Sequence, residues 1–400
     1  FLYLMLIPPL LSFLLIIILI LALSKYELSI ILFLSSFLFA LLTAVNIFES
    51  TLSVVLNPSI VILAIAVTFI PILGGIMEDS GLMLELVQKM RVSKKASLMV
   101  SPAFFGLLPV AGGALMSAPI VDQIDRELNP NQKVAINVWY RHVLIFIYPL
   151  SSALIVASIL SNISLYVLVV ALAFPCLILI LIGYLTMVKN VEPFKTEQQR
   201  DLKRVFHNLI PIIIAPIIDF IGRTFFGVIV PETFLLIGLV ISVLVALVFA
   251  QMSLKDLKPI VKKMKIWRFP LLILAMFLFL EVFIRSGVPE EIGAMNLPLI
   301  MFIILGFVLG FATGRIQIPL SILIPIYLIQ FNLGSVFLLD FILIYSAIFV
   351  GYLITPVHPC VAYSTQYFDS NYKNVLRFLA VPASICFGLV IGTTLIYSLF

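Results

Sequence analysis

Long apolar runs, separated by short polar stretches, dominate the chain from end to end. A run of about 20 apolar residues forms a helix that crosses the hydrocarbon core of a bilayer. The pattern predicts ten crossings, five on each side of a charged segment at 189–204. We expect them at about 3–23, 28–47, 58–73, 136–160, 165–188, 207–228, 234–250, 269–284, 340–364 and 375–398. The predicted fold class is an all-α, polytopic membrane protein.

Two further apolar segments, 96–121 and 297–329, contain several prolines and glycines each. Proline removes a backbone donor and clashes with the preceding turn, so a straight membrane-spanning helix is disfavoured there. Two arms of about 11 residues reach only about half of a 30 Å core. Both segments are therefore predicted to be re-entrant hairpins, with tips at 109–113 and 312–315.

The two halves of the chain match at a nearly constant offset, which indicates an internal duplication. Pro8 matches Pro211, a shift of 203 residues, and Pro149 matches Pro356, a shift of 207. The first repeat is predicted at 1–188 and the second at 205–400, with 189–204 as a cytoplasmic linker. Each half has five crossings and one hairpin, and this odd number makes the two halves an inverted repeat.

Basic residues are distributed unevenly between the predicted loops. The loops at 189–204 and 255–268 are rich in Lys and Arg, whereas those at 49–56 and 287–296 have none. The positive-inside rule therefore predicts a multi-pass protein of the cell membrane with both termini external. The first hairpin then enters from the cytoplasm and the second from outside, so that their tips meet near the midplane.

Composition excludes several other classes of protein. With 63% hydrophobic and 11% charged residues, the chain is too apolar for a soluble protein of 400 residues. The net charge of +5 lies in a few loops, which indicates topology and not nucleic-acid binding. The three cysteines form no CxxC pair, and neither HExxH nor GxSxG occurs. We therefore expect no disulfide framework, no metal, no cofactor and no enzyme.

Two predicted crossings are broken by proline. Pro356 and Pro359 interrupt the crossing at 340–364, with His358 between them, and Pro149 interrupts the crossing at 136–160. Broken backbone survives in lipid only where it faces protein or a wet cavity. An ionisable group at such a break indicates a transport site, and the alternative is a proline kink with a hydrogen-bonded histidine. His358 would either bind the substrate or carry a proton.

Arg315, at the second predicted hairpin tip, is the strongest candidate for binding substrate charge. Its planar guanidinium matches a carboxylate, and the alternative is an ion pair with another buried side chain. Glycines near the tips either admit a ligand to the backbone or pack helices closely, and nearby hydroxyls act as ligands or as caps. The further candidates are Gly112, Gly113, Gly314, Ser117, Ser151, Ser152, Thr313 and Thr355.

Three acidic residues are candidates for binding a coupling ion: Asp122, Asp219 and Glu281. The last two each precede an arginine by four residues, Arg223 and Arg285, so that ion pairs within a helix are favoured and a proton or cation relay is the alternative. Asp122 is expected to pair with Arg141 or Lys133. Arg141 itself is expected to anchor a helix end at the membrane surface.

Three motifs carry a resemblance to a known family: LPVAGGALMSAPIVD at 108–122, INVWYRH at 136–142 followed by Tyr148-Pro149-Leu150, and TPVHPC at 355–360. They resemble a family of polytopic membrane proteins with a domain of unknown function. This family looks like a branch of the ion-transporter superfamily of divalent-anion/sodium symporters and gluconate/C4-dicarboxylate permeases. The resemblance implies a homodimer with scaffold and transport parts and an elevator-like movement. The sodium symporters carry Ser-Asn-Thr at both hairpin tips, which this chain lacks.

Two functions are consistent with these patterns. The first is a secondary active transporter of a small carboxylate-type anion, coupled to H⁺ or Na⁺. The second is a cation/proton antiporter that uses the intramembrane acidic residues. The expected partners are the small anion, the lipid bilayer and a second copy of the chain, without nucleic acid.

Overall fold

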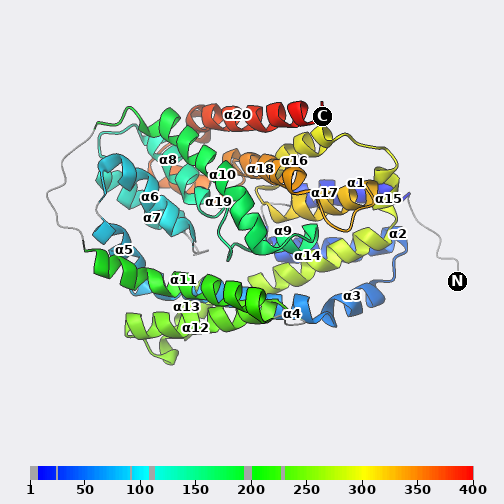
Figure 1. The fold of residues 1–400 in the computed structure, drawn as a ribbon, viewed down its shortest axis with the longest axis horizontal. Helices are drawn as coiled ribbons and strands as arrows, with labels where there is room; N and C mark the ends of the chain where they lie inside the picture. Colours follow the sequence, from blue (N-terminus) through cyan, green and yellow to red (C-terminus); the bar gives the residue numbers. More distant parts are fainter. Residues whose placement is uncertain are drawn as a thin grey trace.

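The computed structural model of the protein describes residues 8–23, 26–90, 92–107, 113–192, 201–226 and 230–399. Every regular element in these ranges is a helix, and no β-strand occurs among them. The predicted all-α class is confirmed (Figure 1).

The helices described before residue 190 end in a π-helical turn at Tyr184–Val188. They are α1 (Pro9–Ala22), α2 (Leu28–Thr43), α3 (Ile47–Val55), α4 (Pro58–Asp79), α5 (Leu82–Met90), α6 (Lys94–Leu107), α7 (Gly113–Ile124), α8 (Pro130–Val143), α9 (Ser152–Ser161) and α10 (Leu165–Gly183).

The helices described after residue 200 include a short 3₁₀ turn at Leu254–Asp256. They are α11 (Leu202–Phe225), α12 (Glu232–Ala250), α13 (Leu257–Met264), α14 (Arg268–Arg285), α15 (Val288–Gly293), α16 (Leu299–Thr313), α17 (Gln317–Gln330), α18 (Leu338–Ile354), α19 (Pro359–Tyr367) and α20 (Tyr372–Tyr397).

Within the described ranges, six helical stretches are long and apolar enough to cross a membrane, or seven if α13 and α14 count as one span bent by 51°. This number is lower than the ten predicted. Helices α1 and α2 are shorter than 18 residues, and residues 1–7 of the first predicted crossing lie outside the described part. The crossing at 136–160 is divided between α8 and α9, which the segment containing Pro149 separates.

Three local predictions are wrong, one of them the outer loop expected at 287–296, which contains the helix α15. The outer loop expected at 49–56 is largely helical, because the Asn46 side chain accepts the N–H groups of Phe48 and Glu49 and starts α3. The third crossing, expected at 58–73, extends further than predicted, since α4 continues to Asp79. A Cβ atom at Gly75 would lie 2.4 Å from the Ile260 side chain of α13, so the glycine there serves close helix packing.

The helices pack into two sets that alternate along the chain. Set A consists of α1–α4 and α11–α14, in which α2 packs on α14 and α4 packs on α12. Set B consists of α6–α10 and α16–α20, in which α6 packs on α8 and α16 on α18. In Figure 1, α4, α11 and α12 lie along one side of the molecule, and α10, α18 and α20 along the other.

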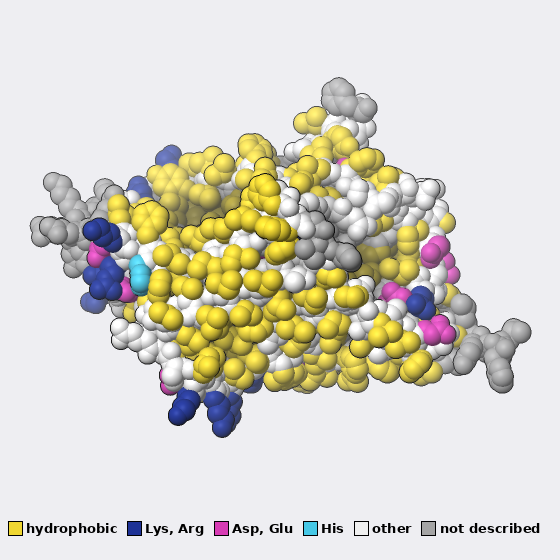
Figure 2. All heavy atoms as spheres, turned by 60° about the horizontal axis from the view of Figure 1, so that its bottom comes forward, with side chains coloured by type: hydrophobic (Ala, Val, Ile, Leu, Met, Phe, Trp, Pro, Cys, Tyr) yellow, Lys and Arg dark blue, Asp and Glu magenta, His cyan; other side chains and the backbone are white. Residues whose placement is uncertain are grey.

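Large apolar side chains cover much of the outer surface. Figure 2 shows a broad hydrophobic face, with Lys, Arg, Asp and Glu side chains gathered toward its edges. On α10, for example, Val170 is 75% exposed and Phe174 is 71% exposed. Exposed apolar helix faces of this extent are typical of contact with lipid, which supports a membrane protein.

Candidate functional site

A cavity of about 400 Å³ lies between set A and set B. Set A lines it with residues of α4, α13 and α14 and with Glu27, which precedes α2. Set B lines it with residues of α6 and α8, the start of α9, the segment 314–317, and the break between α18 and α19. The cavity therefore joins segments from both halves of the chain.

Arg315 borders the cavity directly after α16. Gly314 ends this helix with a φ of 60°, a left-handed conformation that glycine adopts without strain. The N–H of Arg315 donates to the Thr313 hydroxyl at 3.3 Å. Among the described residues no carboxylate forms an ion pair with its guanidinium, and Glu27 acts on it only at longer range. Arg315 thus brings an unneutralised positive charge to the cavity.

The start of α9 also faces the cavity. Ser151 is the N-cap of this ten-residue helix, yet its side chain makes no capping hydrogen bond. The adjacent Ser152 hydroxyl accepts a hydrogen bond from Gln317 Nε2 at 3.2 Å, which ties the start of α9 to the segment containing Arg315. The first N–H groups of a helix have no partner within the helix and are suited to bind an anion.

His358 fixes the break between α18 and α19. Its Nδ1 accepts the N–H of Cys360 at 2.9 Å, so His358 caps α19, and Tyr372 satisfies the exposed carbonyl of Ile354 by donating its hydroxyl at 2.6 Å. Because Nδ1 accepts, Nε2 carries the proton, and it donates to the Tyr352 hydroxyl oxygen 2.5 Å away. The broken backbone is therefore held by specific hydrogen bonds.

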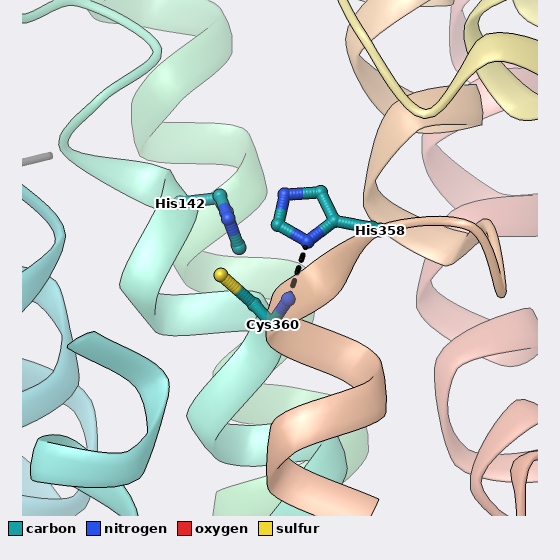
Figure 3. Close-up of side chains that lie close together, drawn as sticks. All are labelled: His142, His358 and Cys360. Carbon is teal, nitrogen blue, oxygen red and sulfur yellow. Dashed lines mark hydrogen bonds between the residues drawn. The ribbon is translucent and has the colours of Figure 1, made fainter. Parts of the chain in front are cut away.

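His142, His358 and Cys360 form a cluster whose candidate ligand atoms lie within 4.8 Å of one another (Figure 3). His142 donates from its Nδ1 to the Val138 carbonyl at 2.6 Å, which leaves Nε2 as the ring atom that could bind a metal. Both ring nitrogens of His358 are already hydrogen-bonded. The charge of Arg141 acts on Cys360, and those of Arg141 and Arg315 act on His358. Since these positive charges repel a cation, the cluster fits a metal ion poorly.

The opposite wall carries an ion pair that the sequence did not reveal. Arg268, the first residue of α14, lies with its Nε 2.8 Å from a carboxylate oxygen of Glu27. The sequence placed Arg268 in the basic loop at 255–268 and gave no role to Glu27. The charge of each residue beside a predicted crossing could have marked it as a candidate, but the sequence does not show that the two residues meet.

The structure brings five of the predicted substrate-binding residues to the cavity: Ser151, Ser152, Gly314, Arg315 and His358. It places Thr313, Thr355 and Ser117 in buried positions. The Thr355 hydroxyl accepts the Val357 N–H at 3.3 Å, and the Ser117 hydroxyl donates to the Ala114 carbonyl at 3.4 Å. Gly113 begins α7, and Gly112 lies outside the described residues.

The three candidate acidic residues lie elsewhere, each in an ion pair. Asp219 is 2.8 Å from Arg223 and also accepts the Tyr166 hydroxyl at 2.9 Å. Glu281 is 2.7 Å from Arg285, and Asp122 is 2.7 Å from Lys133. None of the three lines the cavity described above.

Arg141 lies deeper in the protein than the sequence analysis predicted. The interfacial anchoring expected for Arg141 is wrong, because its side chain is 4% exposed and lines the cavity. The tight contact of α6 with α8 explains this burial: a Cβ atom at Gly106 would lie 1.7 Å from the Arg141 carbonyl oxygen.

Comparison with known proteins identifies a family whose function is unknown. Residues 7–398 match a family model whose description is "Protein of unknown function (DUF401)". No curated protein matches the chain.

Proposed function

The chain belongs to this family of unknown function, and we propose from its cavity that it is a secondary active transporter of a small carboxylate-type anion. One observation carries the proposal: the guanidinium of Arg315 borders a cavity between two helix sets and has no ion pair among the described residues. A charge inside a membrane protein is costly unless it is paired, so such a group marks a site for a charged ligand. Its planar fork can hold both oxygens of a carboxylate.

The surroundings of Arg315 favour an anion over a cation. Arg141 adds a second guanidinium to the same wall, and Arg268 is already neutralised by Glu27. The uncapped start of α9 adds backbone N–H groups that suit a carboxylate. Ser151 and Ser152 supply hydroxyls at the same place, so that charge and hydrogen-bond donors converge on one ligand.

The packing pattern supports an inverted repeat with two re-entrant hairpins. Several contacts between the two halves occur in equivalent pairs: α2 on α14 corresponds to α12 on α4, α7 on α19 to α17 on α9, and α3 on α14 to α13 on α4. Helices α9 and α19 start at Ser152 and Pro359, and α10 and α20 start at Leu165 and Tyr372, both pairs 207 residues apart. In this proposal α6 with α7 and α16 with α17 are the hairpins.

A cavity between two helix sets supports an elevator-like movement, in which set B carries the substrate past set A within a homodimer in the cell membrane. The uneven distribution of Lys and Arg between the loops supports a topology with both termini external. Coupling to H⁺ would involve His358, whose proton on Nε2 is shared with Tyr352. Coupling to Na⁺ is the alternative, and the thermal-shift screen below distinguishes the two ions.

A cation/proton antiporter is less well supported. Its candidate residues Asp122, Asp219 and Glu281 are each neutralised by a basic partner at 2.7 or 2.8 Å. The cavity wall carries more arginine than acidic residues, which disfavours a cation as cargo.

A thermal-shift screen of the purified protein tests the proposal. Carboxylates, phosphate and sulfate would be tested with and without Na⁺ at acidic and alkaline pH. A ligand at a hundred times its Kd stabilises the folded state by about 2.7 kcal/mol. We expect one carboxylate class to stabilise the native protein and the Arg285→Ala control but not Arg315→Ala, since Arg285 pairs with Glu281 away from the cavity. Stabilisation by cations alone would replace this proposal with the antiporter.

A further inference from the structure

Helix α13 lies where the chain meets the membrane surface. It connects α12, a candidate membrane span that ends at Ala250, to α14, an apolar helix that begins at Arg268. Residues 251–267 carry five lysines, which are too costly to place in the hydrocarbon core, so this connection belongs at the lipid headgroups. Helix α13 also forms an angle of 51° with α14, so it does not simply extend that span.

One face of α13 is fixed to the protein. Ile260 and Met264 are buried, and they lie against Gly75 of α4. Lys263 reaches back to α4, where its Nζ lies 3.0 Å from Glu78 and 2.7 Å from Asp79. The helix therefore has a defined orientation, and its other face is turned outward.

The outward face carries a patch of positive charge. Four lysines are exposed and form no ion pair among the described residues: Lys255, Lys258, Lys262 and Lys265. The nearby acid, Asp256, is engaged by the N–H and hydroxyl of Ser253 at 2.7 and 2.8 Å, and these hydrogen bonds hold its pKa below its ordinary value. Two exposed apolar side chains flank the lysines, Leu254 at 71% and Trp267 at 48%.

We propose that this patch binds the phosphate groups of anionic phospholipids. Lysines clustered on an amphipathic helix attract anionic headgroups, and Trp with an adjacent apolar residue favours the interface between headgroups and acyl chains. Apolar flanks of this kind have no role in binding a soluble anion. The apolar face of α13 is packed on α4, so the lysines keep a fixed position relative to the rest of the protein and face the headgroups.

Lipid bound at α13 would also act on the cavity. Met264 lines the cavity, and Arg268, which begins α14 beyond the bend that follows α13, holds Glu27 on the cavity wall. Headgroups that fix α13 therefore fix the set A wall. The binding site stands on the placement of α13 and does not depend on anion transport.

Thermal unfolding in nanodiscs tests this inference. The protein would be placed in discs of phosphatidylcholine with increasing phosphatidylglycerol, and its melting temperature measured. The variant Lys255→Gln/Lys258→Gln/Lys262→Gln/Lys265→Gln removes the patch. The control Arg126→Gln/Lys203→Gln/Lys373→Gln/Arg377→Gln removes four exposed charges elsewhere that likewise form no ion pair among the described residues.

We expect the melting temperature of the native protein and the control to rise with phosphatidylglycerol, and the patch variant to lose most of that rise. The rise should shrink at high salt, since exposed charges are screened. An equal rise in the patch variant would overturn the proposal. It would also be overturned if inorganic phosphate, added to pure phosphatidylcholine discs, gave the same stabilisation, because the ligand would then be a soluble anion.

Discussion

Arg223 and Arg315 are two guanidinium groups within the helical body of the protein, and they differ in their partners. Arg223 places its Nε 2.8 and 2.9 Å from the two carboxylate oxygens of Asp219, which also accepts the Tyr166 hydroxyl. This network joins α10 to α11, and Glu232, 3.9 Å from Arg223, extends it to α12. Arg315 has no ion pair among the described residues and borders a cavity. The difference separates a charge that holds helices together from a charge that is free to bind a ligand.

Removing Asp219 should produce the largest loss of stability. Asp219→Ala leaves Arg223 in a largely buried position with only Glu232, 3.9 Å away, to offset its charge. We expect the free energy of unfolding to fall by about 3 kcal/mol, as measured by chemical denaturation in detergent. The double variant Asp219→Leu/Arg223→Leu should recover most of this loss. A single variant as stable as the native protein would show that the pair does not hold the helices.

Disturbing the contact between α6 and α8 should produce the next largest loss of stability. Gly106→Ala forces a Cβ atom toward the Arg141 carbonyl oxygen, and overpacking of this kind costs about 1–3 kcal/mol. Thermal unfolding measures the effect. Gly392→Ala on α20 is the matched control, because among the described residues no atom beyond its own stretch of helix lies within 4 Å of the new Cβ. Equal effects of the two substitutions would contradict the close approach of α6 and α8.

Removing the N-cap of α19 should cost less stability than disturbing the contact between α6 and α8. His358→Ala removes the acceptor for the Cys360 N–H, and loss of an N-cap costs about 1 kcal/mol. His358→Asn keeps a side-chain acceptor at this position and should retain most of the stability, although it loses the bond to Tyr352. If both variants melted at the same lowered temperature, the cap would not be the stabilising contact.

Arg315 should have the smallest effect on stability. With no ligand present, Arg315→Ala removes a charge that lacks an ion pair among the described residues, so we expect no loss in the free energy of unfolding, because an unpaired charge inside a membrane protein is itself costly. Chemical denaturation in an anion-free buffer measures this. A loss as large as that of Asp219→Ala would mean that Arg315 has a structural partner, and the contrast with Arg223 would fail.

The sequence allowed prediction of features that local chemistry determines. Long apolar runs gave the helical class, and prolines located the interruption between Ile354 and Pro359. The interruption predicted at 312–315 lies where α16 ends, at Thr313. These features depend on steric and hydrogen-bonding limits within a few residues, so the sequence alone carries them.

Contacts between distant segments could not be predicted in this way. Glu27 and Arg268 meet only because α2 packs on α14, and His142 approaches His358 only because α8 lies beside α19. Apolar periodicity does not specify which helices become neighbours, since many pairings bury similar area. The buried position of Arg141 was misjudged for the same reason.

Uptake of labelled carboxylates into proteoliposomes tests the central claim most directly. Native protein, Arg315→Ala and Arg285→Ala would be reconstituted at equal amounts, and uptake followed under a pH or Na⁺ gradient. We predict uptake by the native protein and by Arg285→Ala, and a reduction of more than about tenfold in Arg315→Ala, equivalent to at least ~1.4 kcal/mol. Equal uptake by Arg315→Ala and the native protein would contradict the account.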